Sequence, residues 1–134
     1  MKIFNVWKNN EPSLEAHEDE RGKIADIFYD TTINHVAIIS SKAGAIRGNH
    51  YHKLTTQYVL VTKGEVEYWH KPIETEEPTE HKVLKEGDFV VTPPLCVHAF
   101  KTLSDNEFIV FSTGLRGGKD YEKDTYRLDS PLLE

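Results

Sequence analysis

Short runs of alternating apolar and polar residues extend over most of the chain, separated by glycine, proline and charged residues. Runs of this kind that are rich in valine, isoleucine and aromatic residues are typical of half-buried β-strands. No run combines a helical period with a capping residue, so we expect little helix. The predicted strands occupy residues 23–30, 35–41, 56–64, 65–71, 80–85, 88–92, 97–103 and 107–113.

The turns between these runs indicate an antiparallel architecture. "TKGEV" at 62–66 and "KEGD" at 85–88 each place a glycine between two strands, which is a hairpin signal. Many short antiparallel strands predict an all-β sandwich or small barrel. No linker divides residues 1–134, so we expect a single domain, with a solvated acidic loop at 72–79. The glycine-rich and then polar tail from about residue 114 is expected to lie over the barrel or a partner.

Composition narrows the class of protein without identifying it. The chain has a net charge of −6 and a pI near 5.6, so no basic surface points to nucleic acid or to an anionic membrane. The single cysteine, Cys96, excludes an internal disulfide and fits a reducing compartment. No stretch approaches the roughly 18 apolar residues of a membrane span. The sequence therefore predicts a cytoplasmic protein, in which an anionic substrate would need a local cationic pocket.

Three histidines are the main candidates for chemistry. His50 and His52 are two residues apart, so in a strand both side chains point to the same face. If Gln57 also faces that space, it adds one more polar group to a mostly apolar interior, as in small-molecule sites. His98 follows much later in the chain. A His-x-His pair with a distant histidine is a common ligand set for Zn, Fe, Ni or Mn.

The spacing of these residues resembles the two motifs of the cupin superfamily. In cupins, two histidines and a carboxylate of the first motif and a histidine of the second bind a metal inside a jelly-roll barrel. The resemblance therefore implies an all-β cupin jelly roll (a double-stranded β-helix). The matching positions are Gly44, His50, His52, Gln57 and Gly64 in the first motif and Gly87, Pro93 and His98 in the second.

Two positions depart from the cupin pattern. Gln57 replaces the usual glutamate, and Leu95 replaces a glycine of the second motif. An amide oxygen is a weaker, neutral metal donor than a carboxylate. Three imidazoles still suffice for a metal site with open positions. Metal binding by His50, His52, Gln57 and His98 is therefore one of two open interpretations.

A second resemblance concerns the nucleotide-sugar branch of the cupins. "RGNHYHKLTTQ" at 47–57 is similar to dTDP-4-dehydrorhamnose 3,5-epimerases, dTDP-sugar 3,4-ketoisomerases and the cupin domain of capsular polysaccharide reductase-epimerases. "DERGKIADIF" and "HAFKTLSD" resemble segments of the epimerases, and "DYEKDTYRL" resembles the ending of the ketoisomerases. The resemblance implies isomerisation or epimerisation of a nucleotide-linked 4-keto-6-deoxy sugar through an enolate, in polysaccharide biosynthesis.

Roles follow from this resemblance residue by residue. His50 corresponds to the proton-abstracting histidine, with His98 as a second catalytic residue lining the pocket. Arg47 corresponds to an arginine near the diphosphate, and Arg21 to one that assists nucleotide binding, although its sequence context also fits a solvated turn. His52 and Gln57 would contact substrate. Ketoisomerases keep a glutamine at the position of Gln57 and depend on no metal, so no cofactor is required in this interpretation.

One departure separates the chain from a full 3,5-epimerase. Those enzymes place a catalytic tyrosine thirteen residues after the position of His98, where this chain has Phe111. A phenyl ring cannot donate a proton to an enolate. Replacement acids would have to come from elsewhere, and the candidates are Tyr58, Tyr68, Tyr121 and Tyr126.

Two other functions stay open. One is a metal-dependent cupin of another reaction class, such as an oxygenase, and the other is a non-catalytic cupin that binds sugar. The resemblance also implies a homodimer, since many such barrels pair through strands and exchanged termini. The sequence specifies neither the sugar nor the nucleotide.

Overall fold

The computed structural model describes residues 2–8, 15–114 and 123–133. In those ranges the chain forms β-strands and a single short 3-10 helix, η1 (Val6–Lys8). The strands are β1 (Lys2–Asn5), β2 (Ala16–Asp19), β3 (Gly22–Ala25), β4 (His35–Ser41), β5 (Ile46–Tyr51), β6 (Gln57–Lys63), β7 (Val66–Pro72), β8 (Glu80–Leu84), β9 (Asp88–Thr92), β10 (Cys96–Thr102), β11 (Asn106–Ser112) and β12 (Tyr126–Arg127).

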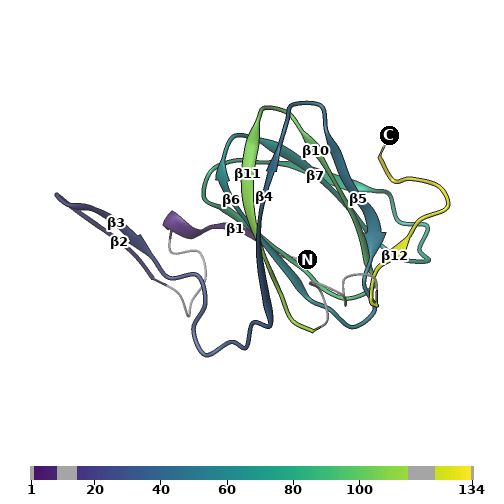
Figure 1. Ribbon diagram of the computed structural model, residues 1–134, viewed down its shortest axis with the longest axis horizontal. Coiled ribbons are helices and arrows are strands. Elements are labelled where there is room, and N and C mark those ends of the chain that lie inside the picture. The colour runs from purple at the N-terminus through teal and green to yellow at the C-terminus, as the bar shows by residue number, and fades with distance from the viewer. Residues whose placement is uncertain (1, 9–14, 115–122, 134) are drawn as a thin grey trace.

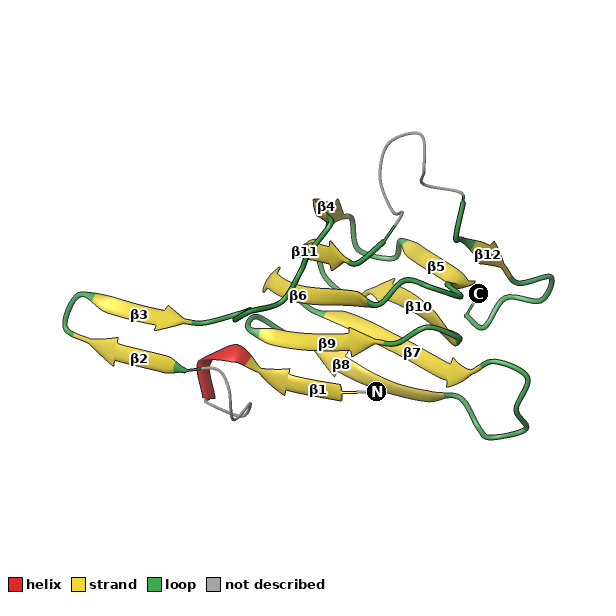
Figure 2. Ribbon diagram, turned by 90° about the horizontal axis from the view of Figure 1, so that it is seen from below, coloured by secondary structure: helices red, strands yellow, loops and turns green. Residues whose placement is uncertain are grey.

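Two antiparallel five-stranded sheets enclose the interior. One has the strand order β1-β9-β6-β11-β4 and the other β12-β5-β10-β7-β8. Figure 1 shows the two sheets curving around a common interior, and Figure 2 shows the hairpin β2–β3 as an arm that projects from the barrel. The all-β jelly roll predicted from the sequence is therefore confirmed.

Alternation along the strands places the core between the sheets. In β6, residues Val59 and Val61 are buried while Tyr58, Leu60 and Thr62 are only partly covered. The two sheets meet through stacked rings, with Phe100 of β10 lying 5.3 Å from Phe108 of β11 between ring centroids. Such buried apolar side chains supply most of the favourable free energy of folding. The core cluster is Val59, Val61, Val66, Tyr68, Leu84, Val90, Phe100, Phe108 and Val110.

The strand predictions are partly wrong at the ends of the chain and at the first histidine motif. Residues 26–34 are not a strand; only the start of the run predicted at 23–30 pairs, in β3. The predicted set omits β1, β2, β5 and β12. The residues of β5, IRGNHY, show no alternation of apolar and polar side chains. Within the strand Gly48 and Asn49 adopt left-handed conformations with φ of 89° and 60°. The strand is consequently irregular at this point.

None of the helices in the described ranges has the length and apolar character needed to cross a bilayer.

Gly44 and Gly64, two glycines of the first motif, have similar backbone conformations but different surroundings. Both have positive φ, which costs roughly 1–2 kcal/mol for a residue with a Cβ. At Gly44 (φ 90°) an added Cβ meets nothing within 4 Å. At Gly64 (φ 74°) it would lie 2.9 Å from the Cβ of Asn106 and closer still to the carbonyl oxygen of Asp105.

We therefore expect Gly44→Ala to lower the free energy of unfolding by about 1–2 kcal/mol, and Gly64→Ala to lower it further because the turn must also move. Urea unfolding of both variants measures the difference. Equal losses in the two variants would contradict this account of Gly64.

Candidate active site

The irregular part of β5 brings His50 against β10, and His52 follows directly after the end of β5. At Gly48 the backbone of β5 approaches β10 so closely that an added Cβ would lie 2.8 Å from the carbonyl oxygen of His98. The pairing register shifts between His98 and Ala99, and His50 lies directly opposite His98. The local bulge thus turns the His-x-His pair towards the strand that carries the third histidine.

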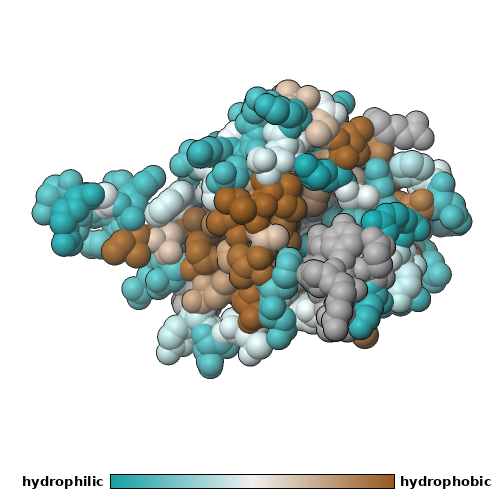
Figure 3. All heavy atoms as spheres, viewed as in Figure 1, coloured by the Kyte–Doolittle hydropathy of each residue, from teal (hydrophilic) through white to brown (hydrophobic). Residues whose placement is uncertain are grey.

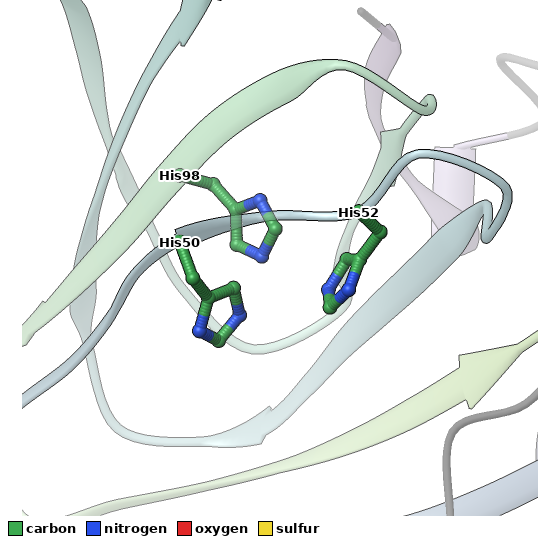
Figure 4. A group of neighbouring side chains, drawn as sticks. All are labelled: His50, His52 and His98. Atoms are coloured by element: carbon green, nitrogen blue, oxygen red, sulfur yellow. The ribbon is translucent and has the colours of Figure 1, made fainter. Parts of the chain in front are cut away.

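The three imidazoles form one compact cluster, and Figure 4 shows the rings directed towards a common space. Ring centroids lie 5.0 Å apart for His50 and His52, 4.7 Å for His50 and His98, and 5.4 Å for His52 and His98. One nitrogen of each ring lies within 4.8 Å of the others. All three side chains are buried. The cluster predicted from two distant motifs therefore exists in the fold.

Hydrogen bonds determine the tautomers of two of these rings. Nδ1 of His52 lies 2.6 Å from the backbone oxygen of Asp124, and Nδ1 of His98 lies 3.1 Å from that of Cys96. A carbonyl oxygen can only accept, so each Nδ1 carries the proton and donates it. In the neutral rings the lone pair is therefore on Nε2. A nitrogen lone pair is what a proton acceptor or a metal ligand requires.

A cavity of about 240 Å³ opens beside the cluster. His50, His98 and Gln57 line it, together with two arginines at residues 47 and 127, and the other lining side chains are apolar. Apolar walls with a few polar groups are the usual form of a small-molecule site. Gln57 is almost fully buried, so its amide is held within the barrel. His52 contacts the cluster but does not line the cavity.

Two arginines border this cavity. The Nε of Arg47 donates to the hydroxyl of Ser41 at 2.8 Å, and its Nη2 donates to the carbonyl of Ser40 at 3.1 Å. These bonds orient the guanidinium and leave other N–H donors for a ligand. Arg127, on β12, lines the same cavity, and sequence reasoning missed it. Its signal was the tail segment "DTYRL", which resembled ketoisomerases but gave no indication of which residue mattered.

Arg21 lies far from this group. It occupies the β2–β3 turn, where its Nη2 pairs with the carboxylate of Asp19 at 2.8 Å, and its side chain is 83% exposed. Figure 2 shows this turn at the outer end of the projecting arm. The geometry matches the solvated-turn alternative. A role of Arg21 in nucleotide binding stays a prediction.

Phe111, the residue at the expected acid position, faces away from the cavity. On β11 the inward residues include Phe108 and Val110, which line the cavity, and Phe111 points to the opposite face. There its ring packs edge-on against Phe28, with centroids 4.9 Å apart. A tyrosine at this position would therefore not reach the cavity in this fold. The absence of a hydroxyl at Phe111 is therefore weaker evidence against epimerase activity than the spacing from His98 suggested.

The candidate acids differ in their positions. Tyr58 packs on the outer face against Phe28, Tyr126 stacks on Tyr51, and Tyr121 lies outside the described residues. Among the candidates in the described residues, only Tyr68 points into the barrel, where its hydroxyl lies 2.6 Å from that of Thr92.

The environment of Tyr68 makes it a weak acid. Burial raises the pKa of its phenol well above the ordinary value, and the hydrogen bond with Thr92 offsets this only in part. An efficient proton donor has a pKa near the working pH. The structure therefore favours a neutral, structural Tyr68 over a catalytic one.

Asp124 is a second residue that sequence reasoning missed. Its carboxylate accepts four hydrogen bonds of 2.9 Å, from the backbone N–H groups of Lys53, Leu54 and Thr55 and from the hydroxyl of Thr55. Burial alone would raise the pKa of this carboxyl group, but these donors outweigh it and the pKa is lowered. Asp124 is therefore ionised at neutral pH and ties the tail to the β5–β6 loop.

The fold and the histidine site together define a cupin-type jelly roll. Residues 17–126 match the polysaccharide biosynthesis C-terminal domain, and the chain belongs to that family. A search of curated proteins found no match.

Solved structures with the same fold come from nucleotide-sugar enzymes. The 3,4-ketoisomerase QdtA of Thermoanaerobacterium thermosaccharolyticum, in complex with TDP-4-keto-6-deoxyglucose, matches with a TM-score of 0.73 and 16% identity, covering 95% of this chain and 86% of that one. The dTDP-4-dehydrorhamnose 3,5-epimerase of Sulfolobus tokodaii matches with a TM-score of 0.65 and 20% identity, over 85% and 76% of the two chains.

A third match is a larger protein. CapF of Staphylococcus aureus, a capsular polysaccharide assembling protein, matches with a TM-score of 0.65 and 21% identity over 87% of this chain. The chain spans only about a third of CapF, 34% of its length. At these identities the likeness shows a common fold.

Proposed function

We propose that this protein isomerises or epimerises a nucleotide-linked 4-keto-6-deoxy sugar by histidine proton abstraction. The observation that carries the proposal is the cavity itself, in which His50 and His98 share apolar walls with Gln57 while Arg47 and Arg127 line the same space. The ligand of the QdtA complex, TDP-4-keto-6-deoxyglucose, is a substrate of this class.

The proposed chemistry uses the acidity of a ketone. A carbonyl at C4 acidifies the protons on C3 and C5, and an imidazole with a pKa near about 6.5 can accept one at neutral pH. His50 is the proposed base because it lines the cavity and has His52 5.0 Å away to share the resulting positive charge. Removal of the C3 proton leaves an enolate whose negative charge develops on the C4 oxygen.

The enolate needs donors that are already in place. The buried amide of Gln57 can donate from its NH₂ group and is one proposed partner of the oxygen; His98 is the other, in its imidazolium form, in which Nε2 also carries a proton. Return of the proton to C3 from the other face inverts that carbon. Transfer of the C3 hydroxyl proton to the C4 oxygen, with return of the abstracted proton to C4, moves the ketone to C3 instead. Both outcomes balance without an oxidant or a cofactor.

The two arginines are proposed to hold the diphosphate. A guanidinium can engage two phosphate oxygens at once, and the donors of Arg47 are oriented by Ser40 and Ser41. In a chain with a net charge of −6, an anionic substrate depends on such a local cationic group. Arg127 supplies a second cation beside the same cavity.

Solvent exchange tests the proposed base. In deuterium oxide, TDP-4-keto-6-deoxyglucose should take up deuterium at C3 or C5, or at C4 of a product whose ketone has moved to C3, and mass spectrometry measures the rate. His50→Ala should lower this rate about 10²-fold or more because general-base catalysis is lost. His81→Ala is the control, since His81 lies on the surface and stacks on Trp69. Substrate binding without exchange would favour the non-catalytic alternative, and an undiminished rate in His50→Ala would exclude His50 as the base.

A metal centre is the second candidate, favoured by the compact cluster of His50, His52 and His98. Three imidazoles fit Zn²⁺, Ni²⁺, Fe²⁺ or Mn²⁺, and Gln57 could add an amide oxygen. A bound cation would supply Lewis-acid stabilisation of the developing negative charge.

Chelation separates the two candidates. If proton transfer needs no metal, exchange by chelator-treated protein continues at the untreated rate. If the unaltered site holds metal weakly because it lacks a carboxylate, Gln57→Glu should bind Zn²⁺ more tightly than the unaltered chain. Calorimetry measures the two affinities. Stoichiometric iron that survives purification, or exchange that returns only when metal is restored, would replace the leading proposal with the metal-dependent one.

The homodimer implied by the cupin resemblance is also proposed. β4 ends its sheet in the described part of the chain, and its outward side chains Val36 and Ile38 are 58% and 65% exposed. Figure 3 shows a hydrophobic area where Figure 1 places β4 and β11. An apolar face beside an unpaired edge strand is a liability unless another chain covers it.

Ile38→Glu should therefore shift the protein from dimer to monomer, because it places a charge in the proposed interface. Light scattering coupled to size-exclusion chromatography measures the mass. Val83→Glu, at an exposed apolar position on β8 of the other sheet, is the matched control. A monomeric wild-type protein, or an Ile38→Glu dimer, would show that this face is not the interface.

A further inference from the structure

A short C-terminal segment runs along β5, which carries His50 and ends one residue before His52. We call residues 123–128 the C-terminal strap. Its β12 pairs with β5, with Tyr126 opposite Tyr51 and Arg127 opposite His50. The ring of Tyr126 stacks on Tyr51, and the amino group of Lys53 lies 4.2 Å from its centroid. The strap therefore covers the edge of β5 along the length that forms the histidine cluster.

The strap is fixed to the chain by one buried carboxylate. Asp124 is 5% exposed and accepts three successive backbone N–H groups and one hydroxyl from residues 53–55. These residues follow His52 directly. Charge-assisted hydrogen bonds are among the stronger ones in proteins, and four on one carboxylate leave little freedom for its backbone. The position of the Asp124 carbonyl is consequently set by the side chain of the same residue.

That carbonyl is the acceptor for Nδ1 of His52, at 2.6 Å. His98 has the same tautomer, but its acceptor, the carbonyl of Cys96, lies two residues away on its own strand. The two rings thus differ in one respect. The orientation of His98 is a local property of β10, whereas that of His52 depends on a residue 72 positions later in the chain.

We propose that Asp124 is a positioning residue of the active site: its carboxylate holds the strap so that its carbonyl keeps the proton of His52 on Nδ1 and the Nε2 lone pair directed to the cluster. The strap is then a part of the site, acting through His52. Partners that orient the second nitrogen of a functional histidine commonly change affinity or activity about 10- to 100-fold when they are lost.

Nitrogen NMR of the histidine rings tests the proposal directly. In wild-type protein, His52 and His98 should both show a pyrrole-type Nδ1 and a pyridine-type Nε2, with His52 assigned from the spectrum of His52→Gln. In Asp124→Asn, an NH₂ group replaces one acceptor oxygen and faces the loop amides. His52 should then become a mixture of tautomers while His98 stays unchanged. His98 is an internal reference for a folded barrel.

Asp129→Asn is the matched control, because Asp129 is an exposed carboxylate in the same C-terminal segment. It should leave both rings unchanged. A wild-type His52 protonated on Nε2, or an Asp124→Asn spectrum identical to wild type, would overturn the proposal. If Asp124→Asn does not fold, Thr55→Val removes only one of the four donors. The Nδ1 proton of His52 should then exchange faster with water, and an unchanged exchange rate would overturn the proposal.

A second measurement separates positioning from simple stabilisation. This part rests on the proposed function. In the deuterium-exchange assay, Asp124→Asn should lower kcat about 10- to 100-fold with KM little changed, because His52 does not line the cavity. A rise in KM alone would contradict the assigned role. If the chain catalyses no exchange at all, the proposed function fails, while the NMR result still decides whether Asp124 positions His52.

Discussion

The antiparallel pairing of β5 with β10 is the constraint on which both the cavity and the histidine cluster depend. The close approach at Gly48 and the register shift beside His98 twist β5 locally. A side chain at position 48 would push the strands apart at the point where the three rings meet. Glycine is therefore required at position 48 by strand packing, and its replacement would also disturb the histidine cluster.

The electrostatic character of the site follows from the side chains that line the cavity beside the β5–β10 pair. The side chains that line the cavity include two guanidinium groups, an amide and two imidazoles, and no carboxylate. A glutamate at position 57 would hold a metal cation well, but it would repel an enolate and a diphosphate. The neutral amide of Gln57 suits the proposed reaction, in which negative charge develops in this cavity. The neutral glutamine and the two arginines both make the electrostatic potential in the cavity favourable for negative charge.

Much of the fold could be predicted because its information is local. The alternation in residues 56–64 and 107–113 specifies strands directly, and glycines such as Gly64 specify the turns between them. In the site, the i, i+2 rule indicated that His50 and His52 share a face. Prediction failed where conformation depends on distant partners. β12 is too short to show a period, and Asp124 acts on a loop about 70 residues earlier. Phe111 was placed by counting residues from His98, which does not determine the face of the next strand.

If the substrate is a sugar nucleotide, as proposed, the size of the cavity divides its recognition between two regions. At about 240 Å³ it is smaller than the roughly 300–1,000 Å³ of pockets that enclose whole drug-sized ligands. A sugar nucleotide would therefore lie partly outside the barrel, with its base and ribose on the surface. The cavity would then select the hexose, and separate surface residues would select the nucleotide. Surface substitutions could change the accepted carrier nucleotide during evolution while the buried proton-transfer residues stay the same.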